Sequence, residues 1–143
     1  MNAIAGASML RVEVGNLVFL GRLEVERAPR TVAAVLARLP LTGHLLQARW
    51  SGESAWMPLG DFDFGIGEEN ATRSPALGQL LLYPKGISET EILFPYGQTA
   101  FASKFGPLAG NHFLTIVEGR DQLAEMGHRV VWQGAQPIRF AAG

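Results

Sequence analysis

Apolar and polar residues alternate along much of this chain. The first alternating run places Leu10, Val12 and Val14 on one side and charged residues on the other. A period of two residues predicts a β-strand with one buried face. The pair Gly15-Asn16 tolerates the positive φ angles of a tight turn, so this strand and the next alternating run, residues 17–26, form a predicted hairpin.

Similar short runs recur along the rest of the chain, separated by turn-forming residues. In the first of them we expect Leu46, Ala48 and Trp50 to face the core and Arg49 to point outward. The predicted strands are His44–Trp50, Ser54–Leu59, Leu80–Tyr83, Glu91–Tyr96, Phe101–Phe105, His112–Val117, Arg129–Trp132 and Ile138–Phe140.

One segment has the period of a helix instead. We predict a helix over Thr31–Leu39, with Pro29 near its start and Pro40 at its end. Asp121–Met126 is predicted to form one or two helical turns at most. The apolar residues of the first helix fall at i, i+3, i+4 and i+7, which is the stripe of an amphipathic helix: Val32, Val35, Leu36 and Leu39.

About eight short strands with one or two short helices predict a mainly β fold. A closed eight-stranded β-barrel with capping helices satisfies this pattern better than an open sheet. The 17 Gly and 8 Pro residues provide the many turns that such a fold needs. A length of 143 residues predicts one domain over residues 1–143, of which residues 1–8 form a flexible or edge segment.

Composition and charge exclude several classes of function. With 12 basic and 13 acidic residues the net charge is −1, so we expect no nucleic-acid partner. There is no cysteine, and the three histidines never fall at ligand spacing, so we predict neither a metal nor a cofactor. No secretory signal and no long apolar run are present, so we expect a cytoplasmic protein without a membrane partner. The apolar content of 48% favours a homodimer.

Part of the sequence resembles cyclophilins. The residues Gly21-Arg-Leu-Glu-Val-Glu, then Ala28-Pro29-Arg30-Thr31-Val32, resemble the strand and helix that open that fold. From about Leu10 to Phe140 the chain is similar to a bacterial group of small cyclophilin-like proteins of unknown function. The resemblance implies an eight-stranded cyclophilin-like barrel and no particular activity. The segments that carry it include Ala48-Arg49-Trp50-Ser51-Gly52-Glu53, Glu69-Asn70-Ala71-Thr72, Phe94-Pro95-Tyr96-Gly97 and Gly110-Asn111-His112-Phe113.

The resemblance also implies where an isomerase site would lie. Cyclophilins place an arginine beside the prolyl bond, and Arg49 is the counterpart by order of elements. Its Phe and His neighbours are replaced by Gln47 and Ala48, and Glu53 could hold it in an ion pair. We therefore expect no robust prolyl isomerase activity.

Three functions remain open, and the sequence does not establish an enzyme. The first is binding of a small metabolite or short peptide-like ligand in a pocket on the barrel rim or outer face. The second is weak or specialised prolyl isomerisation centred on Arg49, and the third is a structural role in an assembly. The candidate ligand-binding residues are Arg49, Glu53, Trp56, Tyr83, Tyr96, Asn111 and His112.

Overall fold

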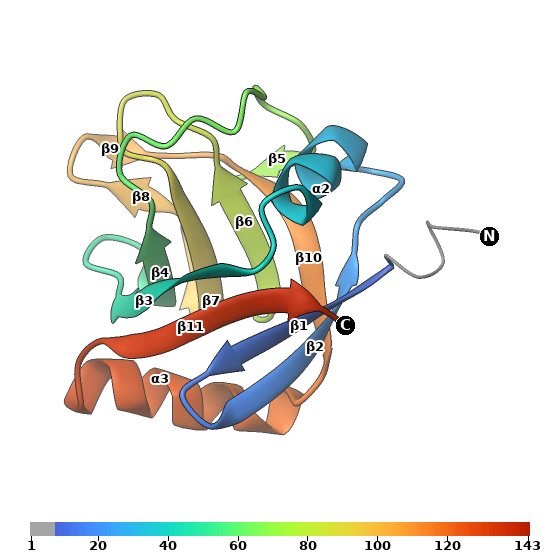
Figure 1. Ribbon diagram of the computed structural model, residues 1–143. Helices are drawn as coiled ribbons and strands as arrows, with labels where there is room; N and C mark the ends of the chain where they lie inside the picture. Colours follow the sequence, from blue (N-terminus) through green and yellow to red (C-terminus); the bar gives the residue numbers. More distant parts are fainter. Residues whose placement is uncertain (1–7) are drawn as a thin grey trace.

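The computed structural model describes residues 8–143 and shows a closed antiparallel β-barrel (Figure 1). The predicted flexible or edge segment, residues 1–8, lies outside the described residues except for its last residue. The elements are β1 (Met9–Val14), β2 (Leu17–Leu23), α2 (Pro29–Leu36), β3 (Leu41–Gln47), β4 (Gly52–Pro58), β5 (Ala71–Thr72), β6 (Gln79–Tyr83), β7 (Glu91–Thr99), β8 (Ala102–Ser103), β9 (Gly106–Pro107), β10 (Gly110–Glu118), the 3-10 turn η1 (Arg120–Gln122), α3 (Leu123–Trp132) and β11 (Gln136–Ala142).

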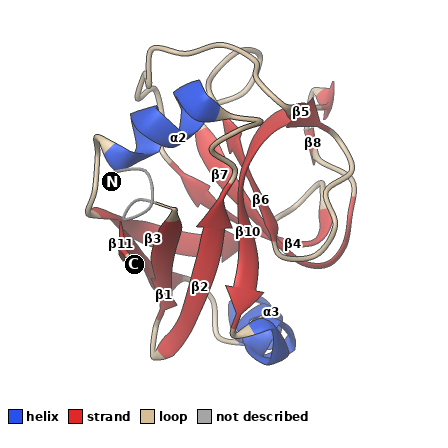
Figure 2. Cartoon of the chain, turned by 90° about the vertical axis from the view of Figure 1, so that its right-hand side faces the viewer, coloured by secondary structure: helices blue, strands red, loops and turns tan. Residues whose placement is uncertain are grey.

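Eight strands form the barrel wall, in the order β2-β1-β11-β3-β4-β7-β6-β10, and β10 pairs again with β2 to close it. The short β5 extends the sheet beside β10, and β8 and β9 form a separate hairpin. In Figure 2, α2 lies over one end of the barrel and α3 over the other. The predicted fold class, a mainly β closed barrel with short helices, is confirmed.

The main core fills the barrel. The first predicted strand contributes Leu10, Val12 and Val14, all fully buried, as the alternating pattern requires. Each helix adds apolar side chains from its end of the barrel, including Val35 of α2 and Met126 of α3. Burial of these stripes, rather than intrinsic propensity, stabilises such short helices.

Strands β6 and β7 are buried on both faces, and this positions the candidate site. Their inward residues, such as Ile92 and Phe94, belong to the main core. Their outward residues form a second apolar cluster, because the chain from residue 100 to 109 folds back over the outside of the barrel. This second cluster consists of Leu81, Tyr83, Leu93, Phe101 and Leu108, with Trp56 packed against it.

Three local predictions are wrong. The region predicted to hold at most one or two helical turns, Asp121–Met126, is the 3-10 turn η1 followed directly by the ten-residue helix α3. Arg129–Trp132 is the last part of helix α3 and not a strand, because the buried residues of this region follow a helical spacing while Val131 and Trp132 point outward. In β3 the core residue is Leu45, so the side chain of Leu46 has the opposite orientation to the predicted one, and Ala48 and the exposed Trp50 lie beyond the end of the strand. A shift of one residue in a strand reverses every side chain in this way.

The first helix runs from Pro29 to Leu36, two residues earlier than predicted at its start and three residues shorter at its end. Val32 and Val35 are buried, and Leu36 and Leu39 pack against the core from partly buried positions. Pro29 occupies the first turn as expected. No helix in residues 8–143 combines the length and the apolar character that a membrane crossing requires.

Candidate functional site

A cavity of about 220 Å³ opens on the outer face of the barrel, beside β4 and β7. Three segments enclose it: the connection from β3 to β4, the beginning of β7 with the residues before it, and the β8–β9 hairpin. The lining residues are Ala48, Arg49, Trp50, Ser51, Trp56, Ser88, Glu89, Glu91, Leu93, Ala102, Ser103, Lys104 and Phe105.

Glu91 is the buried acid of this cavity. It is the first residue of β7 and lies opposite Pro58 of β4 and Tyr83 of β6 in the sheet register. Only 6% of the residue is exposed, and its carboxyl group has no hydrogen-bond or ion-pair partner among residues 8–143. Burial, assisted by the negative charge of Glu89, raises the pKa of Glu91 to about 8. At pH 7 this carboxyl group is therefore mostly protonated.

The walls of the cavity are aromatic and its mouth is charged. Trp56 belongs to the second apolar cluster, whereas Trp50 is 56% exposed and Phe105 is exposed as well. Arg49 lies in the bend after β3, and Lys104 lies in the β8–β9 turn with its Nζ atom 5.1 Å from the centre of the Phe105 ring. An apolar cavity with a few convergent polar groups is the usual form of a small-molecule site.

Two of the seven predicted ligand-binding residues line this cavity, Arg49 and Trp56. Glu53 does not, because its Oε1 atom accepts a hydrogen bond of 2.8 Å from the backbone N–H of Gln98. The expected ion pair between Glu53 and Arg49 is absent from the described part of the chain. Arg49 therefore keeps its guanidinium group available at the mouth of the cavity.

The two predicted tyrosines have structural contacts of their own. The hydroxyl group of Tyr83 accepts a hydrogen bond of 3.1 Å from the backbone N–H of Ile87, and its ring packs edge-to-face against Phe101. The hydroxyl group of Tyr96 donates to Oε1 of Gln47 at 2.6 Å. Its ring packs against Gly127 of α3, where a Cβ atom would overlap it. Neither tyrosine lines the cavity.

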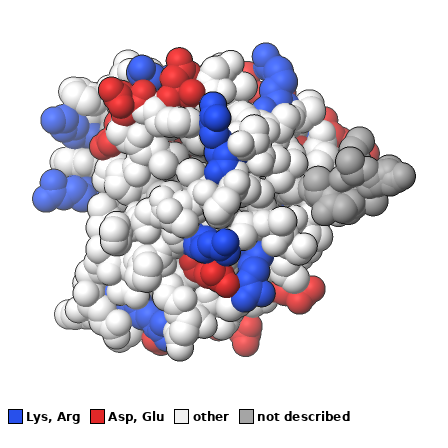
Figure 3. Space-filling view, viewed as in Figure 1, with Lys and Arg blue, Asp and Glu red and all other residues white. Residues whose placement is uncertain are grey.

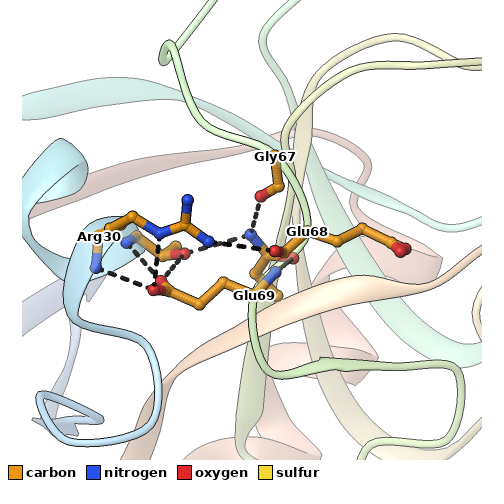
Figure 4. A network of polar contacts seen from close by, with 6 residues as sticks. Arg30, Gly67, Glu68 and Glu69 are labelled. Atoms are coloured by element: carbon orange, nitrogen blue, oxygen red, sulfur yellow. Dashed lines mark hydrogen bonds and ion pairs between the residues drawn. The ribbon is translucent and has the colours of Figure 1, made fainter.

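Asn111 belongs to a buried network at the start of α2, part of which is drawn in Figure 4. Its side-chain amide donates to Oγ1 of Thr31 and to the carbonyl oxygen of Gly67, and its Oδ1 atom accepts from the backbone N–H of Glu69. All these hydrogen bonds measure 2.9 to 3.2 Å. Asn111 thus fixes the loop before β5 against the helix.

His112 lies in another polar cluster, between β10 and β2. Its Nε2 atom is 2.8 Å from Oγ1 of Thr115, which donates to Glu24 at 2.7 Å. Burial lowers the pKa of His112, although the nearby Glu24 opposes this shift. In the described residues no group of three His, Asp or Glu side chains has a geometry that could hold a metal ion.

Sequence reasoning missed Glu91, Trp50, Lys104 and Phe105 as members of the site. One signal could have indicated them. Trp56 and Leu93 are large apolar residues on the outward face of predicted strands, and such residues indicate that another segment covers that face. The covering segment contains Lys104 and Phe105.

Charged side chains are sparse on the face of the molecule in Figure 3, where broad uncharged areas separate them. This distribution agrees with the net charge of −1. Local charge inside a cavity therefore matters more for recognition here than a field extending over the surface.

The fold and the cavity define a class: a small closed antiparallel barrel with a partly enclosed site on its outer face. Within that class, the chain belongs to a family described as "Protein of unknown function (DUF3830)", whose model matches residues 10–142. No curated protein matches the chain.

Two solved structures share the fold. The first is described as "Structure of McbB in complex with tryptophan". Its sequence is 17% identical to this chain, the TM-score is 0.72, and the match covers 92% of this chain and 44% of that one. The chain thus spans less than half the length of McbB. The second is the solution structure of the hypothetical protein AF2241 from Archaeoglobus fulgidus. Its sequence is 21% identical to this chain, the TM-score is 0.62, and the match covers 96% of this chain and 97% of that one. The more specific likeness to cyclophilins stays a prediction.

Proposed function

We propose that this protein binds a small organic molecule with an apolar body in the outer-face cavity, and that a polar group of the ligand contacts Glu91. The observation that carries the proposal is the position of this acid. It is buried, it lines the cavity, and it has no partner in the described structure. Burying a polar group without a hydrogen bond costs about 1–3 kcal/mol in proteins. Such a group at a cavity is a candidate for function.

The shape of the cavity limits the ligand. A volume of about 220 Å³ is smaller than the roughly 300–1,000 Å³ of sites for drug-sized ligands. A metabolite with a single ring fits this size, and a peptide could insert only one side chain. Trp50, Trp56 and Phe105 offer aromatic surface for stacking against such a ring.

The neighbour McbB adds support of a limited kind. Its structure is described in complex with tryptophan, and its barrel resembles this one at a TM-score of 0.72. An identity of 17% relates the folds alone. Small aromatic metabolites are nevertheless reasonable first compounds to test.

The test is a ligand screen followed by calorimetry. A ligand at 100 times its dissociation constant adds about 2.7 kcal/mol to the free energy of unfolding, which raises the melting temperature by roughly 5–10 °C for a domain of this size. We expect Trp56→Ala to weaken binding at least tenfold. Trp132→Ala is the matched control, because Trp132 is 76% exposed on α3 and lies outside the cavity.

Urea denaturation first establishes that both variants are folded. Equal weakening by the two tryptophan variants would contradict the proposal. So would a screen of amines, carboxylic acids, amino acids and neutral aromatic compounds in which nothing binds the wild-type protein.

A further inference from the structure

The charges around the cavity are separated by sign. Both carboxyl groups come from one segment: Glu91 at the start of β7 and the exposed Glu89 just before it. Both cations come from the other walls, with Arg49 in the bend after β3 and Lys104 in the β8–β9 turn. A molecule in the cavity therefore meets acids on one side and bases on the other.

The acid side is built to receive a hydrogen-bond donor. Glu91 is more than nine-tenths buried as a residue, and its carboxyl group lacks a donor among the described residues, in contrast to Glu69 and Glu24, which accept several hydrogen bonds each. A buried carboxylate is stable only when a cation or several donors compensate for its lost hydration. An ammonium group supplies both the charge and up to three donors.

The base side is built to receive an anion. Neither Arg49 nor Lys104 forms an ion pair in the described structure, and the guanidinium group can bind a carboxylate through two parallel hydrogen bonds. Trp56 and Trp50 provide apolar surface in the same cavity, suited to the remainder of the ligand. The three features together fit a zwitterion with an apolar or aromatic side chain.

We propose that the ligand is an α-amino acid or a close analogue, whose ammonium group contacts Glu91 and whose carboxylate contacts Arg49 and Lys104. This inference rests on the proposed function, since it specifies the chemical class of the ligand in the same cavity. It also assigns opposite roles to the two walls, which makes it testable with ligands that lack one charge.

The first experiment compares three ligands that share a side chain. L-phenylalanine carries both charges, 3-phenylpropionate lacks the ammonium group, and 2-phenylethylamine lacks the carboxylate. If another amino acid binds more tightly in a panel of the twenty, its own two analogues replace these. By calorimetry we expect the amino acid to bind ten to a hundred times more tightly than either analogue.

Variants then assign the charges to the walls. Glu91→Gln should lower the affinity for the amino acid at least tenfold and leave the affinity for 3-phenylpropionate nearly unchanged. Arg49→Ala should lower the affinities for 3-phenylpropionate and for the amino acid. It should leave the affinity for 2-phenylethylamine nearly unchanged. Glu118→Gln is the control, since this exposed glutamate lies on β10 and outside the cavity.

The pH dependence distinguishes an ammonium group from a neutral ligand group. Binding of a cation requires ionised Glu91, so affinity should rise about tenfold from pH 6 to pH 7 while the carboxyl group loses its proton. A ligand that accepts a hydrogen bond from the protonated acid would not show this rise. The other ionisable groups beside Glu91 are Glu89, Arg49 and Lys104, which line the same cavity, and Tyr83, which lies opposite Glu91 in the sheet register.

The outcomes separate this inference from the proposed function. Binding of 3-phenylpropionate or a neutral aromatic compound as tightly as any amino acid would overturn the inference and leave the proposed function intact. If Glu91→Gln has no effect on amino-acid binding, the ligand does not contact Glu91, and the inference and the Glu91 contact of the proposed function are both wrong. If nothing binds in the cavity, both proposals are wrong.

Discussion

Glu69 and Thr31 are joined by two hydrogen bonds of 2.8 Å, in which the backbone N–H and the hydroxyl group of Thr31 both donate to Oε1 of Glu69. The backbone N–H of Arg30 donates to the other carboxylate oxygen at 3.2 Å. Ala28, the residue that precedes α2, has no side chain that could accept these protons. A glutamate 38 residues away along the chain thus caps the helix.

We expect Glu69→Ala to lower the free energy of unfolding by about 1–2 kcal/mol, the usual value of a helix cap with a favourable helix dipole. Glu68→Ala is a suitable control, because only the backbone carbonyl of Glu68 contacts Arg30. Urea denaturation at pH 7 measures both. An equal loss in the two variants would show that the Glu69 carboxylate does not cap α2.

The Glu69 carboxylate should also make the free energy of unfolding depend on pH in the acidic range. Burial alone would raise the pKa of Glu69, but the hydrogen bonds from Thr31 and Arg30 outweigh it and lower the pKa below 4.5. A lowered pKa contributes stability that is present above the unfolded value and is lost as the pH falls through the folded value. The difference between wild type and Glu69→Ala should therefore shrink below pH 4.5, as followed by urea denaturation. A difference that stays constant down to pH 3 would contradict this account.

Glu91 should have the opposite effect on stability. Its folded pKa of about 8 lies above the unfolded value of 4.5, so the folded state holds an extra proton between these values. Wild-type stability should fall by up to about 1.4 kcal/mol per pH unit as the pH rises through this window. Glu91→Gln removes the ionisable group and should be more stable than wild type at pH 8 and about equal at pH 4.

Thermal denaturation across this pH range gives the comparison, with Glu118→Gln as the exposed control. If Glu91→Gln were less stable than wild type at pH 8, the carboxylate would have a partner that compensates for its burial. Greater stability together with lost ligand binding would show that the acid is retained for binding and not for folding.

Much of the barrel could be predicted from the alternation of side chains. Leu10, Val12 and Val14 share one face of a strand, and that face alone can be buried. The prediction failed where apolar residues do not define a single face. Leu45 and Leu46 are adjacent, so their pattern does not decide which of them points inward.

The cavity could not be predicted in the same way. Glu91 begins a strand, a position at which a charged residue is ordinarily exposed, and nothing nearby in the sequence indicates its burial. Its burial depends on a segment that follows it and covers the outside of the barrel, where Phe101 and Leu108 pack on Leu93. Such contacts depend on tertiary structure and not on a local period.

Packing of the first helix gives a further prediction. Val35 is fully buried in the main core, so Val35→Ala should lower the free energy of unfolding by about 2–5 kcal/mol through lost burial and a residual cavity. Val131→Ala makes the same chemical change at a helical position that is 47% exposed, and it should cost less than about 0.5 kcal/mol. Urea denaturation of both variants tests this. Similar losses would mean that α2 does not contribute to the core.

The last prediction concerns prolyl isomerisation, which we expect to be near background on standard X-Pro peptides. The uncatalysed barrier of about 18–20 kcal/mol falls only if a site binds the twisted amide better than the planar one. Arg49 lies in an exposed bend and not on a rigid strand, and a displacement of ~1 Å can cost about a hundredfold in rate. The cavity beside it also contains the Glu91 carboxyl group, a buried polar group with which a proline ring forms no hydrogen bond.

A protease-coupled peptide assay at pH 7 provides the measurement. Arg49→Ala should leave the rate at background while it weakens binding of 3-phenylpropionate, so the same variant separates isomerisation from ligand binding. Glu118→Gln should change neither quantity. A robust wild-type rate that collapses in Arg49→Ala would instead favour an isomerase, because the exposed guanidinium group would then act on the amide despite its position in a bend.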